Sequence, residues 1–236
     1  MTPVGADDSG DLVVAMTGAS GAPYAARLIQ VLCRLGRTIH FSLSPSAAEV
    51  LREETGRLAD LDQFDVATFG DLSPGRLVYH HYQDFMAGIA SGSFPTAGMV
   101  IVPCSMSTMG AIASGICANL ITRAADVHIK ERRKLILVPR ETPLSLIHLE
   151  NMLKVTQAGA VVLPAMPGWY HHPNRLDDLV DFIVARICDQ LGIPNSLIRR
   201  WGHEAPSDPQ DEAIGDSQRG LDEIVPERSP EERGDD

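Results

Sequence analysis

Short apolar segments rich in β-branched residues alternate with helical patterns along most of the chain, and this alternation constrains the fold more than any other feature. The predicted strands cover residues 11–17, 38–44, 99–103, 134–139 and 160–164. Strands separated by helices pair in parallel, and the helices pack on both faces of the sheet. The sequence therefore predicts an α/β protein, a three-layer sandwich built on a mostly parallel sheet.

The helices between these strands differ in how clearly their ends are marked. One helix is predicted over residues 45–55, because a proline in the first turn costs no hydrogen bond. An earlier helix carries an apolar stripe at Leu28, Val31, Leu32 and Leu35. The last helix has the broadest stripe and ends at Gly192. Its apolar positions are Leu176, Leu179, Val180, Ile183, Val184, Ile187, Cys188 and Leu191.

The formal net charge of -11 comes mainly from the end of the chain. Residues 203–236 hold 12 of the 31 acidic residues and only 3 of the 20 basic ones. The rest is close to neutral and shows no basic face, which argues against nucleic-acid binding. We predict a flexible N-terminus over residues 1–10, one folded domain over 11–202, and an acidic disordered tail over 203–236.

Nothing in the sequence points to a membrane, a secretory route or a metal. No apolar run approaches the ~18 residues of a membrane-spanning helix, and the polar N-terminus does not resemble a signal peptide. The four cysteines form no CxxC pair, so a reducing cytoplasm is expected. Two histidine pairs, at 80–81 and 171–172, lack an accompanying metal-ligand pattern, and we expect no metal.

A glycine-rich turn, TGASGA at residues 17–22, follows the first strand. Such a turn can place backbone N–H groups and a positive helix end around an anion. The spacing is neither that of a dinucleotide fold nor that of a P-loop. The alternative interpretation is a tight strand–helix turn without a ligand.

Serines follow two of the predicted strands. Ser44 ends the second strand, where NAD-binding folds usually carry Asp or Glu for the ribose hydroxyl groups. A serine suits a phosphate or a flavin edge better, which favours FMN over NAD or FAD. Ser105, Ser107 and Thr108 follow the strand at 99–103, at the edge where open α/β sheets bind ligands. They are also suited to cap the next helix, and the two roles are compatible.

Several longer motifs occur in order from about residue 11 to Trp201. They are MTGASGA, Ser44, SGSF (91–94), PCSMST, LITRAADVHIKERR (120–133), VPRETP (138–143), IHLENMLK (147–154) and PGWYHHP (167–173). Together they resemble the UbiX flavin prenyltransferase family. The resemblance implies a Rossmann-like, flavodoxin-type fold that holds FMN and needs no metal. It also implies homo-oligomers, typically dodecamers, with active sites between subunits.

The activity that the resemblance implies is transfer of a dimethylallyl group from dimethylallyl phosphate to N5 and C6 of reduced FMN. The product, prenylated FMN, is the cofactor of UbiD-type decarboxylases. By matching motif, the FMN contacts would be Gly18, Ala19, Ser20, Ser44, Ser105, Met106, Ser107, Thr108 and Arg123. The substrate contacts would be Ser91, Lys130, Arg140, Glu141, Tyr170 and Arg186. The catalytic residues would be Glu141, Ser20, Lys130 and Trp201, with Trp201 near the reacting allyl group.

The chemistry of these residues is consistent with that activity. Phosphate binding needs cationic and hydroxyl donors, and an allylic cation is stabilised by an aromatic face. The alternative for the KERR run (130–133) is a solvated helix face, and for Arg140 with Glu141 a pair of surface charges. Two other functions remain open: an FMN-dependent cysteine decarboxylase and a non-catalytic flavin carrier. The PCSMST and PAMPGW segments differ from the decarboxylase motifs, and a carrier would leave Lys130, Glu141 and Tyr170 without a role.

Overall fold

The structure is a computed structural model that describes residues 10–202. The chain divides into two compact units, Met1–Ile198 and Arg199–Asp236. All helices and strands among the described residues lie in the first unit. The tail predicted over residues 203–236 lies outside the described residues, as does nearly all of the predicted flexible N-terminus.

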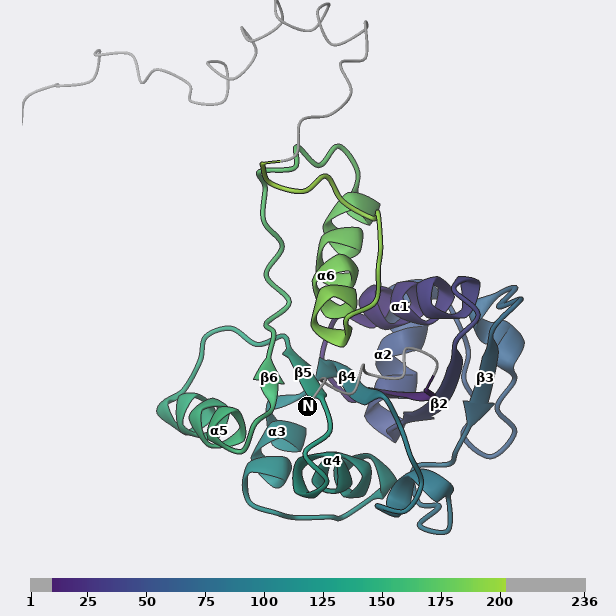
Figure 1. The fold of residues 1–236 in the computed structure, drawn as a ribbon, viewed down its shortest axis with the longest axis vertical. Helices are drawn as coiled ribbons and strands as arrows, with labels where there is room; N and C mark the ends of the chain where they lie inside the picture. Colours follow the sequence, from purple (N-terminus) through teal and green to yellow (C-terminus); the bar gives the residue numbers. More distant parts are fainter. Residues whose placement is uncertain (1–9, 203–236) are drawn as a thin grey trace, which may run out of the picture. The chain divides into compact units, whose positions relative to one another are not determined.

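Six parallel strands form one sheet in the order β3-β2-β1-β4-β5-β6 (Figure 1). The strands are β1 (Leu12–Met16), β2 (Thr38–Leu43), β3 (Arg76–Tyr79), β4 (Gly98–Cys104), β5 (Leu135–Pro139) and β6 (Val161–Val162). This is the strand order of the Rossmann fold, and it reverses direction between β1 and β4. At that point Val14 of β1 is paired with Phe41 of β2 on one side and Val100 of β4 on the other.

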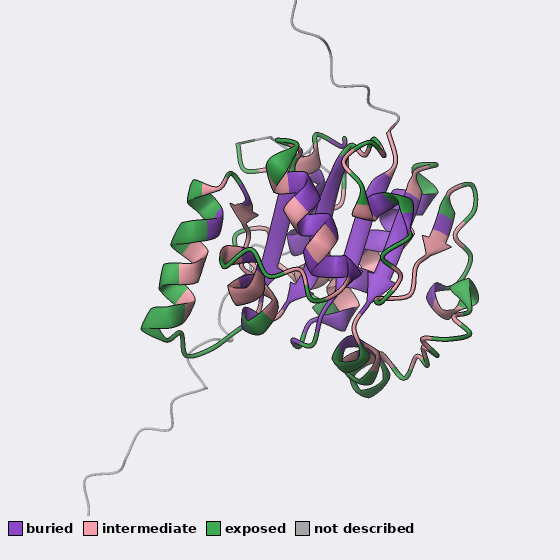
Figure 2. Ribbon diagram, turned by 90° about the horizontal axis from the view of Figure 1, so that it is seen from below, coloured by how far each residue is buried: buried purple, intermediate pink, exposed green. Residues whose placement is uncertain are grey.

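The central strands are buried on both faces, which explains their continuous apolar sequences. Successive side chains point to opposite faces of a strand. Leu12, Val14 and Met16 therefore join one apolar core, whereas Val13 and Ala15 join the other. Figure 2 shows the buried strands lying between helices whose outer sides are exposed.

Three helices cover each face of the sheet (Figure 1). The first core is closed by α1 (Ala22–Arg34), α2 (Pro45–Thr55) and α6 (Leu176–Leu191). The second is closed by α3 (Met106–Ala113), α4 (Leu120–Lys130) and α5 (Leu146–Gln157). Two short 3₁₀ helices, η1 (Val66–Phe69) and η2 (Gly88–Ala90), lie in the connections. No helix among the described residues is long and apolar enough to span a membrane.

The α/β class, the three layers and the parallel sheet are confirmed, and α2 has the predicted bounds. Four details were wrong. Strand β3 was not predicted, Leu35 lies just beyond α1 and is half exposed, and β6 is only two residues long. Leu176 is 81% exposed although it was placed in the buried stripe of α6. It is the first residue of the helix and extends beyond the core that the middle of α6 covers.

Candidate active site

A cleft of about 420 Å³ opens at the carboxyl ends of β1, β4 and β5. It lies at the point where the strand order reverses, which is where open α/β sheets bind their ligands. The residues that line it come from the turn after β1, from α2, and from the ends of β4 and β5. They are Gly18, Ala19, Ser20, Glu49, Val50, Glu53, Glu54, Ser105, Arg140 and Glu141.

The glycine-rich turn can follow its path only because it lacks side chains at two positions. A Cβ atom on Gly18 would collide with the Cβ atom of Ser46, so the turn packs directly against the start of α2. Gly21 has a φ of 126°, which other residues rarely adopt. The turn therefore brings the backbone of residues 18–20 to the wall of the cleft.

Thr17 joins the turn after β1 to the turn after β4. Its Oγ1 atom donates a hydrogen bond to the Pro103 carbonyl at 3.1 Å and accepts one from the Ser105 amide at 2.7 Å. The side chain is buried. The sequence places this threonine in the TGASGA motif, but only the packing of two distant segments shows that its hydroxyl group sets the distance between them.

Glu54 was not predicted, and it occupies two of the backbone donors of the glycine-rich turn. Its Oε2 atom accepts hydrogen bonds from the amides of Gly21 and Ala22, at 2.9 and 2.8 Å. A negative charge is stabilised at a helix N-terminus, and here the chain supplies that charge itself. A bound phosphate would have to displace Glu54 to use these two amides.

The serines after β2 and β4 cap helices; capping was the predicted alternative for Ser105, whereas for Ser44 it was not predicted. Ser44 Oγ accepts a hydrogen bond from the Ala47 amide at 3.2 Å, and Ser105 Oγ accepts one from the Thr108 amide at 3.3 Å. Ser105 Oγ also lies 3.1 Å from the Ser107 hydroxyl group and 3.0 Å from that of Thr108. Ser105 lines the cleft as well, so its two roles coexist. The Met106 side chain is buried in the second core and leaves only its backbone for a ligand.

Arg140 and Glu141 directly follow β5 and line the cleft. The Nε atom of Arg140 is buried and makes no hydrogen bond among the described residues. A buried cationic donor without an acceptor is costly, and an anionic ligand would satisfy it. Glu141 is exposed, and its carboxylate accepts a hydrogen bond from the Thr142 amide at 3.1 Å.

The lining of the cleft fits FMN on the grounds of its donor groups and its volume. Arg140 offers an unsatisfied cationic donor, and Ser20 and Ser105 offer hydroxyl groups. The backbone of residues 18–20 borders the same cleft, whose volume is about 420 Å³. The carboxylates of α2 would repel a phosphate, so an anion is best placed on the Arg140 side of the cleft.

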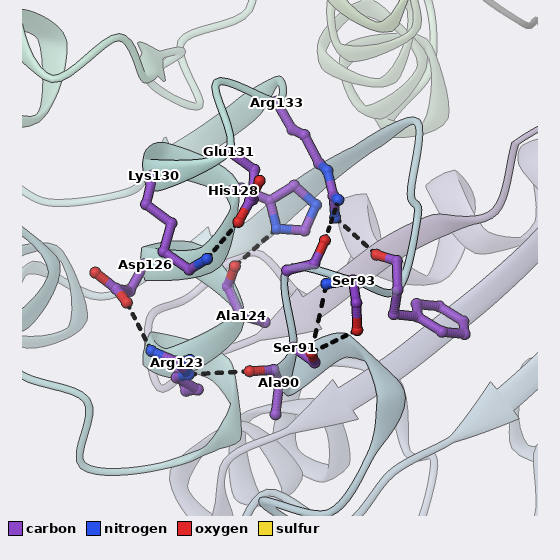
Figure 3. A network of polar contacts seen from close by, with 12 residues as sticks. Ala90, Ser91, Ser93, Arg123, Ala124, Asp126, His128, Lys130, Glu131 and Arg133 are labelled. Atoms are coloured by element: carbon purple, nitrogen blue, oxygen red, sulfur yellow. Dashed lines mark hydrogen bonds and ion pairs between the residues drawn. The ribbon is translucent and has the colours of Figure 1, made fainter.

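A second group of predicted residues lies away from this cleft, on α4 and the loop before β4 (Figure 3). Arg123 donates from Nε to the Ala90 carbonyl at 3.0 Å and pairs with Asp126 at 2.9 Å. Lys130 forms an ion pair with Glu131. Lys130 is the last residue of α4. Shortly after it, the Lys134 carbonyl accepts a hydrogen bond from the Met99 amide at the start of β4. Lys130 therefore lies near the edge of the sheet opposite the cleft.

A third group comes from α6 and the loop before it. Arg186 pairs with Asp189 on α6 at 2.9 Å, and the Tyr170 ring packs edge-on against Phe182 with centroids 5.7 Å apart. Neither lines the cleft within one chain. Trp201 belongs to the second compact unit and is 81% exposed. The roles expected for these residues stay predictions.

Buried His128 and Cys104 have surroundings that indicate a structural role and not a catalytic one. Burial lowers the pKa of His128 to about 4, and its ring bonds the Ala124 carbonyl at 2.7 Å and the Thr96 hydroxyl group at 2.9 Å. Burial raises the pKa of the Cys104 thiol to about 12, so it is not poised as a nucleophile. In the described part of the chain, no group of three or more His, Cys, Asp or Glu side chains is arranged to hold a metal.

The sequence matches the flavoprotein family over residues 3–188. The chain is 50% identical over 193 residues to the flavin prenyltransferase UbiX of Alkalihalophilus pseudofirmus, a match that covers 81% of this chain and 96% of that protein. The crystal structure of AnUbiX (PadA1) in complex with FMN and dimethylallyl pyrophosphate is 41% identical, with a TM-score of 0.74. That comparison covers 84% of this chain and 100% of the other.

A dodecameric FMN-dependent UbiX-like decarboxylase from Escherichia coli O157:H7 is 42% identical, with a TM-score of 0.73. This match covers 82% of the chain and the whole of that structure. The matched lengths take in the sheet and the cleft at its carboxyl edge. The chain therefore belongs to the flavoprotein family and, within it, to the UbiX-type flavin prenyltransferases.

Proposed function

We propose that this protein transfers a dimethylallyl group from dimethylallyl phosphate to N5 and C6 of reduced FMN, and so makes prenylated FMN. The observation that carries the proposal is the cleft at the carboxyl ends of β1, β4 and β5. It combines the glycine-rich turn, Ser105 and an unsatisfied arginine with a carboxylate beside it. The identity of 41–50% to flavin prenyltransferases supports the same conclusion.

Within the cleft, the residues divide into two roles. The backbone of Gly18 and Ala19 and the hydroxyl groups of Ser20 and Ser105 hold FMN, as a second substrate as well as a cofactor. Arg140 neutralises charge on the phosphate that leaves the allyl group. Glu141 handles a proton, because closing the new ring removes one from C6 and the departing phosphate can take one up.

The prenyl donor could be either dimethylallyl phosphate or the corresponding diphosphate. The structure of AnUbiX holds dimethylallyl pyrophosphate, whereas the resemblance of the motifs points to the monophosphate. Arg140 offers one unsatisfied cationic donor in the cleft, which suits the smaller charge of a monophosphate. We therefore propose dimethylallyl phosphate as the preferred donor.

We propose that the protein forms a homo-oligomer, a dodecamer as in the E. coli relative, with active sites between subunits. Helix α5 supports self-association. Val155 is its one buried residue, while Leu146, Leu149 and Leu153 are 71%, 49% and 58% exposed. They are spaced by three and four residues and so form one apolar stripe on the outside of the helix. A stripe of this kind is typical of a surface covered by another subunit.

Assembly would also explain why the predicted site residues fall into three groups within one chain. Ser91, Arg123 and Lys130, and separately Tyr170 and Arg186, would complete the cleft of a neighbouring copy. We further propose that a UbiD-type decarboxylase receives the product. The proposed location is the cytoplasm, a reducing compartment in which thiols such as those of Cys33, Cys104 and Cys117 persist.

The direct test is anaerobic incubation of the protein with reduced FMN and either dimethylallyl phosphate or the diphosphate, followed by mass analysis of the flavin. We expect a flavin heavier by one C₅H₈ unit, formed faster from the monophosphate. A flavin of unchanged mass in both incubations would refute the proposal. Release of CO₂ from a C-terminal cysteine peptide in a parallel sample would favour the cysteine decarboxylase instead.

A further inference from the structure

The loop before β4 is held through alternate carbonyl groups to α4 and to the turn that follows α4 (Figure 3). The carbonyl of Ala90 accepts a hydrogen bond from Arg123 Nε at 3.0 Å. Those of Gly92 and Phe94 accept from Arg133, from Nη2 at 2.6 Å and from Nη1 at 2.7 Å. Two arginines on one side of the loop thus bind every second residue from 90 to 94.

The two serines between these residues take no part in the contacts with the arginines. Ser91 and Ser93 are exposed, whereas the three residues whose carbonyls are bound are partly buried. The Ser91 and Ser93 hydroxyl groups lie 2.9 Å apart and form a hydrogen bond with each other. The loop therefore presents two adjacent hydroxyl groups to solvent, with one of their O–H donors used between them, while its backbone is fixed from behind.

Lys130 is packed against the same loop. A Cβ atom on Gly92 would lie 2.6 Å from the Lys130 Nζ atom and would also collide with the Glu131 carboxylate. A side chain at position 92 would therefore force the ends of the Lys130 and Glu131 side chains to move. This packing brings an ammonium group close to the backbone between the two serines.

Arg133 differs from its cationic neighbours in what it binds. Arg123 pairs with Asp126 and Lys130 pairs with Glu131. Among the described residues, no carboxylate lies within ion-pair distance of Arg133. Its guanidinium group instead donates hydrogen bonds to two backbone carbonyls. Only arginine has this planar arrangement of donors. Its arrangement indicates that the function of Arg133 is to fix the shape of the loop.

We propose that Arg133 is a positioning residue for the prenyl donor: with Arg123 it holds residues 90–94 so that Ser91, Ser93 and Lys130 together bind the phosphate group. The inference rests on the proposed function, and it adds Ser93 to the predicted phosphate contacts. Hydroxyl and ammonium donors are the groups that bind phosphate in proteins. Two hydroxyl groups that already lie side by side need little reorganisation to bind it.

The test compares Arg133→Gln and Arg133→Lys with the control Arg132→Gln. Arg132 is in the same turn, and its exposed side chain makes no hydrogen bond or ion pair within residues 10–202. For each variant, KM for dimethylallyl phosphate, kcat, FMN affinity and hydrogen exchange of residues 88–96 are measured. Arg133→Gln should raise KM about tenfold, leave FMN affinity unchanged and speed exchange. The KM of Arg133→Lys should lie between those of wild type and Arg133→Gln. Added guanidinium ion should partly restore the KM of Arg133→Gln. The control Arg132→Gln should match wild type in all four measurements.

Ser93 gives an independent variant should Arg133→Gln fail to fold. Ser93→Ala should raise KM severalfold and Ser93→Thr should stay near wild type, because threonine keeps the hydroxyl group. Unchanged KM in both Arg133→Gln and Ser93→Ala would overturn the inference. If the wild type makes no prenylated FMN, the proposed function fails. Calorimetric titration with inorganic phosphate, weaker for Ser93→Ala than for wild type, would then still support the phosphate site, and equal affinities would refute it.

Discussion

The Thr17 hydroxyl group accepts a hydrogen bond of 2.7 Å from the Ser105 amide and thereby joins the turn after β1 to the turn after β4. The same group donates to the Pro103 carbonyl at 3.1 Å. These two turns form adjoining walls of the cleft at the reversal of strand order. A buried hydroxyl group with both its donor and its acceptor used is well suited to fix their separation.

Replacing Thr17 with Val keeps the shape of the side chain and removes both hydrogen bonds. The Ser105 amide then loses its partner, while the Pro103 carbonyl keeps only the Thr17 amide, which should lower the free energy of unfolding by about 1–3 kcal/mol. FMN affinity should fall as the two walls shift. Urea unfolding and fluorescence titration measure the two effects. Thr17→Ser, which keeps the hydroxyl group, is the control, and equal behaviour of Val and wild type would refute the bridging role.

Local signals were sufficient to predict some elements from the sequence. The start of α2 follows from Pro45 in its first turn, a signal that acts within a few residues, and the structure adds Ser44 as its cap. Gly192 ends α6 with a φ of 74°, as a glycine after an apolar stripe predicts. The grouping of Ser20, Ser105, Arg140 and Glu141 follows from the rule that strand ends meet at one edge.

Features that depend on distant contacts were not predicted. Strand β3 has four residues at the edge of the sheet, and only its pairing with β2 defines it. Glu54 reaches the Gly21 amide from 33 residues away, and no periodicity indicates such a contact. The positions of Ser91 and Lys130 apart from Arg140 follow from the direction of α4. Their motif spacing carries no information about it.

Replacing Arg140 should make the ligand-free protein more stable and weaken its binding of dimethylallyl phosphate. Its buried Nε atom has no acceptor among the described residues, which costs free energy in the ligand-free protein. Arg140→Met should therefore raise the free energy of unfolding of the ligand-free protein by about 1 kcal/mol. It should also weaken binding of dimethylallyl phosphate at least tenfold. Thermal melts with and without ligand test both. If Arg140→Met is less stable than wild type without ligand, Arg140 stabilises the ligand-free fold and the prediction is wrong.

His128 predicts a loss of stability in mild acid. Its pKa in the folded state is about 4, lowered by burial, whereas an unfolded histidine titrates near 6.5. The unfolded chain therefore binds the proton first, and stability falls as the pH drops from about 6.5 toward 4. Between pH 7.5 and 5 this residue should cost about 2 kcal/mol. Urea unfolding of His128→Gln at both pH values should show a smaller difference than wild type. An equal difference would exclude His128 as its source.

The apolar stripe on α5 predicts how the assembly can be broken. Leu149→Glu combined with Leu153→Glu places two charges on a surface that another subunit should cover, and burying an unpaired charge is costly. Light scattering after size exclusion should show a smaller particle with unchanged secondary structure. Leu58→Glu is the control, because that leucine is 71% exposed and lies outside α5. Assembly that is unchanged in the double variant would place the interface elsewhere.

Glu141 offers the most direct test that prenyl transfer takes place in the cleft beside Arg140. Glu141→Gln keeps the size of the side chain and its ability to accept the hydrogen bond from the Thr142 amide. It removes the capacity to take up a proton. FMN and dimethylallyl phosphate should still bind, while the chemical step should slow by ~10²–10⁴-fold.

The measurement is a single-turnover reaction of enzyme-bound reduced FMN with dimethylallyl phosphate, with the flavin quenched at intervals and its mass determined. Wild type should accumulate flavin that carries one C₅H₈ unit, and Glu141→Gln should hold both substrates and form the same product far more slowly. A Glu141→Gln rate within a few-fold of wild type would contradict the assignment of the reaction to this cleft.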